Sequence, residues 1–339
     1  MRALIFKQLG AIETVELADL PLLTPEKGQV RIKITSAGLN RADTLFPEGR
    51  YFFKPQFSRL ASTNIDTNYS RLGFEGAGII DAVGPEVDYS VGDRVAITPL
   101  VLNVSHQGCM AEYGIYDANT LIPTPDRISD EDAGSIWMQY LTAWGGLIID
   151  GQLKQGQSVV ITAASSSVGI AAIQIANMLG ANTIATTTSE EKMAQLNQLG
   201  AQHVINMKTD DYVTQIKHLT QNKGTDLVFD AVAGPDIRDL VQGSAKGGKI
   251  IIQGMLDRRP MDIHAGVLMK RLLTVKGFTL DEVLENPEIL DECVTQITKG
   301  INTNQLTPVI AQKFTLPQFK EAFSFLKSNK HTGKIVINP

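Results

Sequence analysis

The sequence predicts an α/β protein with two domains, one a mainly antiparallel β domain and the other a doubly wound parallel sheet. The chain has 339 residues, which is long for a single hydrophobic core. Its early part shows short alternating or β-branched runs, whereas its later part alternates short apolar runs with segments of helical period. Because strand character returns at the chain end, we expect residues 1–125 and 280–339 to form the first domain and residues 126–279 the second.

The first domain is expected to open with a strand at Leu4–Phe6. Val30–Ile34 alternates strictly between apolar and polar residues, as a half-buried strand does. The three glycines of Gly73–Gly78 and the turn at Val91–Val95 indicate antiparallel strands joined by tight corners. Ile335–Ile337 is expected to end the chain as a strand that rejoins this domain.

The second domain is expected to repeat a strand–helix unit. The expected strands are Val159–Ile161, Asn182–Thr186, Val204–Ile205, Leu227–Phe229, Lys249–Gln253 and Leu273–Gly277. The expected helices are Val168–Leu179, Glu190–Leu199, Asp210–Asn222, Asp236–Ala245 and Ala265–Lys270. This alternation is typical of a parallel sheet with helices on both faces.

The composition argues against several classes of protein. A net charge of −5 and a pI of 5.6 do not suggest a nucleic-acid-binding surface. No run of about 18 apolar residues is present, so we expect no membrane-spanning helix, and the first apolar run is too short for a signal peptide. The two cysteines, Cys109 and Cys293, are too few for a disulfide framework, so a cytoplasmic protein is expected.

The segment from Ser158 to Gly180 has the pattern of a dinucleotide-binding strand, turn and helix. The fingerprint G-x-G-x-x-G falls here on Ala164, Ser166 and Gly169, so only the glycine that lets the helix pack closely on the strand is kept. Small residues at the other two places leave room for a pyrophosphate, which helix amides and the helix dipole would bind. An ordinary strand–turn–helix connection is the alternative, and the surrounding βαβ pattern favours a nucleotide site.

The end of the next strand indicates which dinucleotide binds. A site for NAD carries an acid there to bind the ribose 2′-hydroxyl, but here the first acid is Glu190. The hydroxyl groups of Thr187 and Ser189, with the nearby Lys192, suit a 2′-phosphate, so NADPH is the expected cofactor. Ser189 has the alternative role of capping the following helix, and the two roles are compatible.

Motifs in several parts of the chain occur in a recognisable order. They are Gly73–Gly78 followed by Gly84 and Val87, Gly92–Val95, Trp137–Ala143, Phe229–Gly234 and Gly333–Val336. Together they resemble the medium-chain dehydrogenase/reductase superfamily, and specifically its zinc-free quinone-oxidoreductase-like branch, over essentially the whole chain. The resemblance implies a GroES-like catalytic domain, a Rossmann domain, and a homodimer paired through the edge strand near Leu273–Phe278.

The departures from the superfamily's pattern concern zinc. Its zinc-dependent alcohol dehydrogenases use a cysteine and a histidine as ligands, and the corresponding places here are Asn40 and Phe74. The cysteine-rich lobe for structural zinc is absent, and the five histidines show no ligand spacing. We therefore expect no metal. Met207 stands where related quinone reductases often carry a tyrosine near the adenosine phosphate, which weakens the NADPH interpretation without reversing it.

The resemblance places Asn40, Asp43 and Tyr51 beside the nicotinamide and the substrate. Asn40 is a candidate hydrogen-bond donor to a substrate carbonyl, with a turn residue as the alternative. Tyr51 is a candidate for the same contact or for stacking, with packing inside its own loop as the alternative. Asp43 is better explained as orienting Arg41 or capping a short helix than as a proton donor, and Glu75 as a buried acid that braces the cleft.

The resemblance also implies contacts to the cofactor. Ser166, Ser167, Val168 and Gly169 are expected under the pyrophosphate. The further contacts expected are Thr142, Val232, Gly254, Met255, Phe278, Thr279 and Lys334. For Met255 and Phe278, plain core packing is the alternative.

Without a metal, the cofactor supplies the chemistry by transferring hydride to an electrophilic carbon or a quinone ring. The sequence therefore predicts an NADPH-dependent, zinc-independent reductase of quinones or similar activated carbonyl compounds. Two alternatives stay open: a reductase of enoyl or alkenal double bonds, and a cofactor-binding protein used for interaction with little catalysis. The irregular loop Tyr51–Arg71 is expected to cover the cleft.

Overall fold

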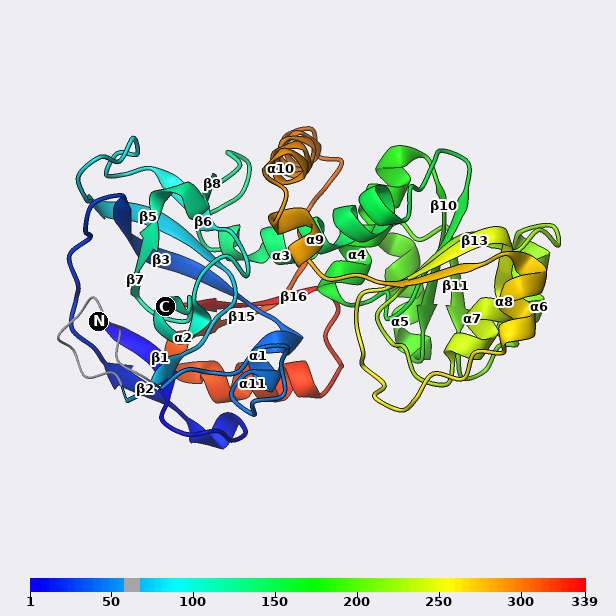
Figure 1. Ribbon diagram of the computed structural model, residues 1–339, viewed down its shortest axis with the longest axis horizontal. Coiled ribbons are helices and arrows are strands. Elements are labelled where there is room, and N and C mark those ends of the chain that lie inside the picture. The colour runs from blue at the N-terminus through cyan, green and yellow to red at the C-terminus, as the bar shows by residue number, and fades with distance from the viewer. Residues whose placement is uncertain (58–67) are drawn as a thin grey trace. The chain divides into compact units, whose positions relative to one another are not determined.

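A computed structural model describes residues 1–57 and 68–339 and divides the chain into two compact units (Figure 1). Unit 1 is Met1–Met138 with Ile310–Pro339, and unit 2 is Gln139–Val309. The Tyr51–Arg71 loop was expected to cover the cleft, and its residues 58–67, about half of it, lie outside the described residues.

The boundary of unit 1 lies beyond the expected end at residue 125. Ser36 explains why residues 126–138 belong here, because its hydroxyl donates to the Asp130 carbonyl at 2.9 Å and accepts from the Gly134 amide at 2.7 Å. These contacts join side chain to backbone over almost a hundred residues, so the hydrophobic pattern does not report them.

Residues 280–309 were expected in the first domain, and the structure places them in unit 2. The Gln174 side-chain amide donates to the Thr307 carbonyl at 2.9 Å, and its oxygen accepts from the Thr307 amide at 3.0 Å. A Cβ on Gly300 would lie 3.3 Å from the sulfur of Met178. Both contacts attach this segment to the helix that contains Gln174 and Met178.

Unit 1 contains two sheets that are mainly antiparallel. The smaller has the order β2 (Val15–Asp19), β1 (Arg2–Phe6) and β4 (Ser70–Arg71). The larger has the order β15 (Ile310–Thr315), β16 (Lys334–Asn338), β3 (Gln29–Leu39), β5 (Gly76–Val83), β6 (Arg94–Ile97) and β8 (Leu121–Pro123), and β7 (Tyr113–Asp117) also pairs with β3. Because β16 pairs antiparallel with β3, the expected return of the chain end to this domain is confirmed.

Short helices connect the strands of unit 1. They are η1 (Ile12–Thr14), α1 (Arg41–Leu45), α2 (Val104–Gln107), η2 (Ala118–Thr120), η3 (Ala133–Ser135), η5 (Leu316–Gln318) and α11 (Phe319–Lys327). Helix α3 (Trp137–Trp144) begins at the end of this unit and is followed by the π-helical η4 (Gly145–Asp150).

Unit 2 is a parallel sheet of six strands, as expected. Its order is β11 (His203–Asn206), β10 (Asn182–Thr187), β9 (Ser158–Ile161), β12 (Thr225–Asp230), β13 (Ser244–Ile252) and β14 (Thr274–Gly277). Numbered within the unit, this is the order 3-2-1-4-5-6 of a Rossmann fold, in which ligands bind outside the carboxyl ends of the strands where the order reverses. That point lies between β9 and β12.

The helices of unit 2 alternate with these strands. They are α4 (Ser167–Leu179), α5 (Glu190–Gln198), α6 (Tyr212–Leu219), α7 (Ile237–Gly243) and α8 (Ala265–Arg271), followed by α9 (Asp281–Leu284) and α10 (Pro287–Asn302). The first five match the expected helices, with ends displaced by a few residues. Among the described residues, no helix is long and apolar enough to cross a membrane.

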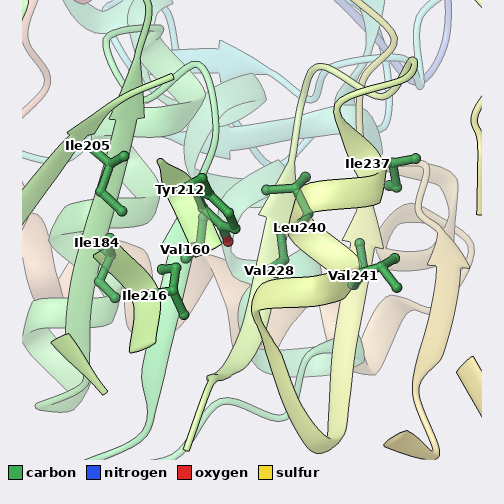
Figure 2. Close-up of a cluster of buried hydrophobic side chains, with 10 residues drawn as sticks. Val160, Ile184, Ile205, Tyr212, Ile216, Val228, Ile237, Leu240 and Val241 are labelled. Atoms are coloured by element: carbon green, nitrogen blue, oxygen red, sulfur yellow. The ribbon is translucent and has the colours of Figure 1, made fainter. Parts of the chain in front are cut away.

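A buried apolar layer fixes the strands of unit 2 relative to α6 and α7 (Figure 2). The strands contribute Val160, Ile184, Ile205, Val228 and Ile250, and the helices Tyr212, Ile216, Ile237, Leu240 and Val241. Each of these side chains is at most 3% exposed. Burying such a side chain contributes about 1.5–3 kcal/mol, so the layer holds the carboxyl ends of the strands in place for the loops that follow them.

Candidate functional site

The connection from β9 to α4 has the geometry of a dinucleotide turn. We call residues Ala164–Gly169 the phosphate turn. Ser166 is the N-cap of α4, and its hydroxyl accepts from the Gly169 amide at 3.0 Å. A Cβ on Gly169 would lie 2.7 Å from the Cα of Ala164, so glycine is required for this close approach. The amides of Ser167 and Val168 open the first turn of the helix, where amide groups have no earlier intrahelical partner.

Lys192 reaches the phosphate turn from the next helix. Its ammonium donates to Ser165 Oγ at 3.1 Å, and its half-buried position lowers the pKa of the amine through desolvation. A positive charge is thus held against the turn at which the phosphates of a dinucleotide would bind. The sequence placed Lys192 near the ribose, and the structure adds its contact with Ser165.

The end of β10 carries the hydroxyl groups expected there. Thr187 is buried, and its Oγ1 accepts from the Ser189 amide at 3.1 Å. Ser189 occupies the N-cap position of α5, but its side chain makes no cap hydrogen bond. Capping by this side chain was the alternative role, and the structure does not show it.

A contact at the same strand end was missed from the sequence. Asn206 Nδ2 at the end of β11 donates to Glu190 Oε2 at 3.2 Å. Thr187 and Asn206 are opposite each other in the parallel register of β10 and β11. The sequence signal was available, because parallel strands end at the same edge of a sheet and Val-Ile-Asn closes the second of them.

On the other side of β9, a buried carboxylate fixes the loop that follows β12. Asp230 is fully buried and accepts from Thr162 Oγ1 at 2.6 Å and from the amides of Val232 and Ala233 at 2.9 and 3.0 Å. From the sequence, Asp230 was only part of the Phe229–Gly234 motif, and Thr162 was not expected at the site. Thr162 directly follows β9 and Asp230 ends the neighbouring β12, and this shared position was the signal that could have identified the pair.

The remaining cofactor candidates of unit 2 differ in exposure. A Cβ on Gly254 would lie 2.8 Å from the Ala231 carbonyl, so Gly254 lies against the loop that contains Val232. Met255 is 57% exposed, which argues against core packing as its role. Phe278 is 4% exposed, and its ring would lie 2.5 Å from a Cβ on Gly145, so it packs in the interior.

Two further candidates of unit 2 stand at helices. Thr142 is buried in α3, at 9% exposure. Thr279 is exposed, and its hydroxyl donates to Asp281 Oδ2 at 3.1 Å, just before α9.

In unit 1, four buried or half-buried polar residues form what we call the polar cluster: Asn40, Asp43, Glu75 and Lys334. The Lys334 ammonium is 1% exposed, ion-pairs with Glu75 Oε1 and donates to Asn40 Oδ1 at 2.6 Å. Asn40 Nδ2 donates to Glu75 Oε1 at 3.0 Å and to the Gly38 carbonyl at 3.2 Å. Glu75 Oε2 accepts from the Met138 amide at 3.0 Å, so this acid is buried and bonded to backbone as expected, while its bracing of a cleft stays a prediction.

The structure brings together Asn40 and Asp43, which were expected at the reaction, and Lys334, which was expected at the cofactor. Both protons of the Asn40 side-chain amide are donated to acceptors within unit 1, so neither is available for a substrate carbonyl. Lys334 is enclosed by Glu75 and Asn40 and does not extend from the closing strand to solvent. The sequence could not show this, since β3, the start of β5 and β16 are brought together only by the fold.

Asp43 caps α1 rather than orienting Arg41. Its Oδ2 accepts from the Asn40 amide at 2.8 Å in a capping box, while Arg41 donates to Asn329 at 2.6 Å. Burial raises the pKa of Asp43 to about 7. The Asn40 amide and the Lys334 ammonium oppose this shift, and the carboxylate of Glu75 adds to it.

Tyr51 lies in an aromatic cluster of unit 1. Its ring centroid is 4.9 Å from that of Phe74 and 5.1 Å from that of Phe53. Phe46 joins the same group, at 5.5 Å from Phe74. Packing with its own loop, the alternative for Tyr51, is therefore observed, and the residue is half-buried.

The residues at the places of the superfamily's zinc ligands do not fit a zinc ion. Asn40 is bonded to an ammonium group, and Phe74 is a fully buried ring. A cation beside Glu75 and Asn40 would face the positive charge of Lys334, which already neutralises the carboxylate. No group of three or more His, Cys, Asp or Glu that could hold a metal is found among residues 1–57 and 68–339.

Two protein families match parts of the chain. The alcohol dehydrogenase GroES-like domain matches residues 26–126, and the family described as zinc-binding dehydrogenase matches residues 167–295. The first match falls within unit 1 and the second within unit 2.

Relatives with known names match over nearly the whole chain. Quinone oxidoreductase of Lama guanicoe is 30% identical over 340 residues, covering 99% of this chain and 97% of that protein. A phenolphthiocerol/phthiocerol polyketide synthase protein of Mycobacterium tuberculosis is 30% identical over 337 residues, covering 98% of this chain. The chain spans only 14% of the length of that synthase.

Solved structures of similar proteins agree with the fold over its whole length. An NAD-dependent alcohol dehydrogenase has a TM-score of 0.88 at 28% identity, covering 100% of both chains. A quinone oxidoreductase of Pseudomonas syringae pv. Tomato DC3000 has a TM-score of 0.85 at 27% identity, covering 100% of this chain and 99% of that one. The CurK enoyl reductase has a TM-score of 0.83 at 26% identity, covering 99% and 98% of the two chains.

Proposed function

This chain belongs to the medium-chain dehydrogenase/reductase superfamily, in its quinone-oxidoreductase-like branch of NAD(P)H-dependent oxidoreductases, and on that premise we propose that it is an NADPH-dependent, zinc-independent reductase of quinones or similar activated carbonyl compounds. The similarity to quinone oxidoreductase along both whole chains supports the reaction class. The contact that carries the choice of cofactor is the hydrogen bond from Lys192 to Ser165, which holds a cation against the phosphate turn.

The phosphate turn fits a dinucleotide. Ser166, Ser167, Val168 and Gly169 would hold the pyrophosphate with backbone amides at the N-terminus of α4. Thr187, Ser189 and Lys192 would hold the 2′-phosphate. When bound, the dinucleotide supplies the hydride, and the protein binds and orients the acceptor.

Val232, Gly254, Met255, Phe278 and Thr279 belong to the loops and strand ends after β12, β13 and β14, and we propose that they line the rest of the cofactor site. In this proposal Phe278 acts by packing, since its ring is interior. Thr142 completes the set carried over from the family, whereas Lys334, which the sequence also assigned to the cofactor, acts in this proposal through the polar cluster of unit 1.

We propose that Asn40, Asp43 and Tyr51 form the acceptor side of the site. Asn40 and Asp43 contribute a rigid polar wall, because their hydrogen bonds are made within unit 1. Tyr51 is the residue suited to touch the acceptor, since its half-buried ring is braced by Phe74 and it carries a hydroxyl group.

Reduction of an enoyl double bond is the second candidate function. It uses the same hydride delivery, and both the polyketide synthase and CurK enoyl reductase resemble this chain over nearly its whole length. Nothing in the polar cluster distinguishes a quinone ring from a conjugated double bond. The choice between them therefore needs a direct comparison of substrates.

The test is NADPH oxidation, followed by absorbance at 340 nm, with a panel of quinones, enals and enoyl thioesters. The proposal expects the quinones to give the highest kcat/KM. A higher value for enoyl thioesters would instead establish the second candidate. NADPH binding without oxidation by any acceptor would favour the cofactor-binding interaction protein, and absence of NADPH binding would refute all three.

We also propose a homodimer paired through the outer edge of β14. This strand is the last in the order of its sheet, and Met269 and Leu272 before it are 72% and 64% exposed. Exposed apolar side chains beside an open strand edge are typical of a protein–protein contact. Light scattering in solution should give twice the 36.9 kDa of the chain, and a monomer mass would refute the dimer.

A further inference from the structure

We propose that Glu190, held by Asn206 at the end of β10, makes the cofactor site tolerant of NADH, so that the chain uses both dinucleotides with only a modest preference for NADPH. This inference rests on the proposed function, because it concerns the same site beside the phosphate turn. It adds the residue that limits the selectivity set by Lys192.

The position of Glu190 is fixed by a buried partner. Asn206 is 3% exposed, and its Oδ1 accepts from the Lys208 amide at 3.1 Å. With its oxygen turned to that amide, the side chain can present only its NH2 group to Glu190, and it donates to Oε2 at 3.2 Å. The backbone of Asn206 is held as well, since its amide donates to Asp210 Oδ2 at 2.8 Å. Glu190 is therefore bound from the sheet side although its own residue is exposed.

Glu190 and Lys192 lie on opposite sides of the same strand end. Both belong to the first turn of α5, which follows β10, and residues two apart on a helix point in nearly opposite directions. Lys192 reaches Ser165 after β9, and Glu190 reaches Asn206 at the end of β11. Because the sheet order is β11, β10, β9, the end of β10 has a cation toward one neighbouring strand and an anion toward the other.

This pair of charges acts in opposite directions on the two dinucleotides. The carboxylate of Glu190 is an acceptor for the ribose 2′-hydroxyl of NADH, as an acid near this strand end usually is. The same charge repels the 2′-phosphate of NADPH, which Lys192 attracts. In the sequence, Glu190 comes three residues after Thr187, the last residue of β10. The sequence alone therefore does not show that Asn206 holds the carboxylate of Glu190 near the end of this strand.

The neighbouring residue, Glu191, provides a matched control for the substitution of Glu190. It is an exposed glutamate in the same helical turn, and its side chain makes no hydrogen bond or ion pair with another described residue. Glu190→Gln and Glu191→Gln change the net charge identically and keep the side-chain volume. Only the first removes a carboxylate that is held at the end of β10.

The experiment is fluorescence titration of the full chain with NADPH and with NADH, which gives the ratio of the two Kd values. Glu190→Gln should raise the preference for NADPH roughly 5- to 10-fold, the scale of one charge near a phosphate at the surface. Glu191→Gln should change the ratio less than about 2-fold. Asn206→Ala should move the ratio in the same direction as Glu190→Gln, by a smaller factor, because the released side chain turns to solvent.

The salt dependence separates this role from a structural one. The shift caused by Glu190→Gln should shrink when the ionic strength is raised from about 0.02 M to about 0.5 M, because surface charges are then screened. Equal ratios for Glu190→Gln, Glu191→Gln and the wild type would overturn the inference while leaving NADPH binding intact. If the wild type binds neither dinucleotide, it is the proposed function that fails.

Discussion

The phosphate turn of unit 2 and the polar cluster of unit 1 use polar residues in opposite ways. In the phosphate turn the side chains are small, those of Ser165–Val168 are partly exposed, and the groups proposed to bind phosphate are backbone amides at the start of a long helix. In the polar cluster the side chains are long, buried and bonded to one another, so that Lys334, Glu75 and Asn40 satisfy each other. We propose that the first region receives a ligand, whereas in the second Lys334, Glu75 and Asn40 already bond one another. Asp43 Oδ1 in the same cluster has no hydrogen-bond partner among the described residues.

Both regions depart from the motifs of the superfamily, and the two departures have different consequences. The phosphate turn has alanine and serine at two of the three fingerprint places and keeps the glycine at Gly169, where a Cβ would lie 2.7 Å from the backbone of Ala164. The polar cluster keeps a recognisable motif around Glu75 and has changed its chemistry, because an ammonium group occupies the surroundings that a metal would need. Mutations should therefore affect stability most in the polar cluster and ligand binding most in the phosphate turn.

The largest effect is expected from Lys334→Met. It leaves the carboxylate of Glu75 buried without its partner, and breaking a buried ion pair on one side costs about 3–5 kcal/mol. Denaturant unfolding followed by circular dichroism measures this loss.

Lys313→Met is the matched control for that variant. Lys313 pairs with Glu131 and Asp132 in the same unit, but its side chain is 38% exposed. An exposed pair contributes less than about 1 kcal/mol. Equal losses for the two lysines would contradict the closed character of the polar cluster.

Asp43→Asn should change how stability depends on pH. The carboxyl has a pKa of about 7 in the folded chain against a reference value of 3.8, so the folded state holds the proton more tightly. Its contribution is fully present below about pH 4 and is lost as the pH rises through 7, which amounts to about 4 kcal/mol. Asparagine removes this titration and keeps an oxygen to accept from the Asn40 amide.

Unfolding free energies at pH 4, 5.5, 7 and 8 measure the difference between Asp43→Asn and the wild type. Relative to the wild type, the variant should gain stability steadily as the pH rises. Asp19→Asn, at an exposed position of β2, should run parallel to the wild type. A parallel curve for Asp43→Asn as well would show that this carboxyl does not titrate near neutrality.

Gly169→Ala should affect both stability and binding. The added methyl group would lie 2.7 Å from the Cα and the carbonyl oxygen of Ala164, so backbone must move, at a cost of about 1–3 kcal/mol. The same movement should weaken NADPH binding, because it displaces the first turn of α4.

Gln215→Ala, at an exposed position of α6 with no proposed contact, serves as the control. It should change the unfolding free energy by less than about 0.5 kcal/mol. Unchanged NADPH affinity in Gly169→Ala would show that the phosphate turn is not where the dinucleotide binds.

Much of the fold could be predicted from the sequence, because strands and helices of unit 2 carry their own periodicity. The run Val159–Ile161 and the helix after Ser166 are local patterns, and their order gives the Rossmann topology. The domain boundaries were displaced because contacts such as Ser36 with Gly134 join distant residues and leave no periodic signal.

The candidate site was predictable where one segment forms it and not where several segments meet. The phosphate turn is continuous in the sequence, so its strand, turn and helix could be predicted, while its binding of a dinucleotide stays a proposal. Glu190 with Asn206, Thr162 with Asp230, and Lys334 with Glu75 are pairs from different elements, and none of these pairings follows from local spacing. The orientation of the Asn40 side-chain amide also depends on Lys334, because the Lys334 ammonium donates to Asn40 Oδ1 from 294 residues away in the sequence.

The central claim is that the chain binds a dinucleotide 2′-phosphate beside the phosphate turn, and Lys192→Ala tests it most directly. Kd values for NADPH and NADH are measured by fluorescence titration for the wild type, Lys192→Ala and, as a control, the exposed Lys217→Ala on α6. Lys192→Ala should weaken NADPH about 10-fold or more and NADH less than about 2-fold, because only NADPH loses a charge-assisted hydrogen bond. Lys217→Ala should change neither. Equal losses of NADPH and NADH in Lys192→Ala, or no binding of either by the wild type, would contradict the account.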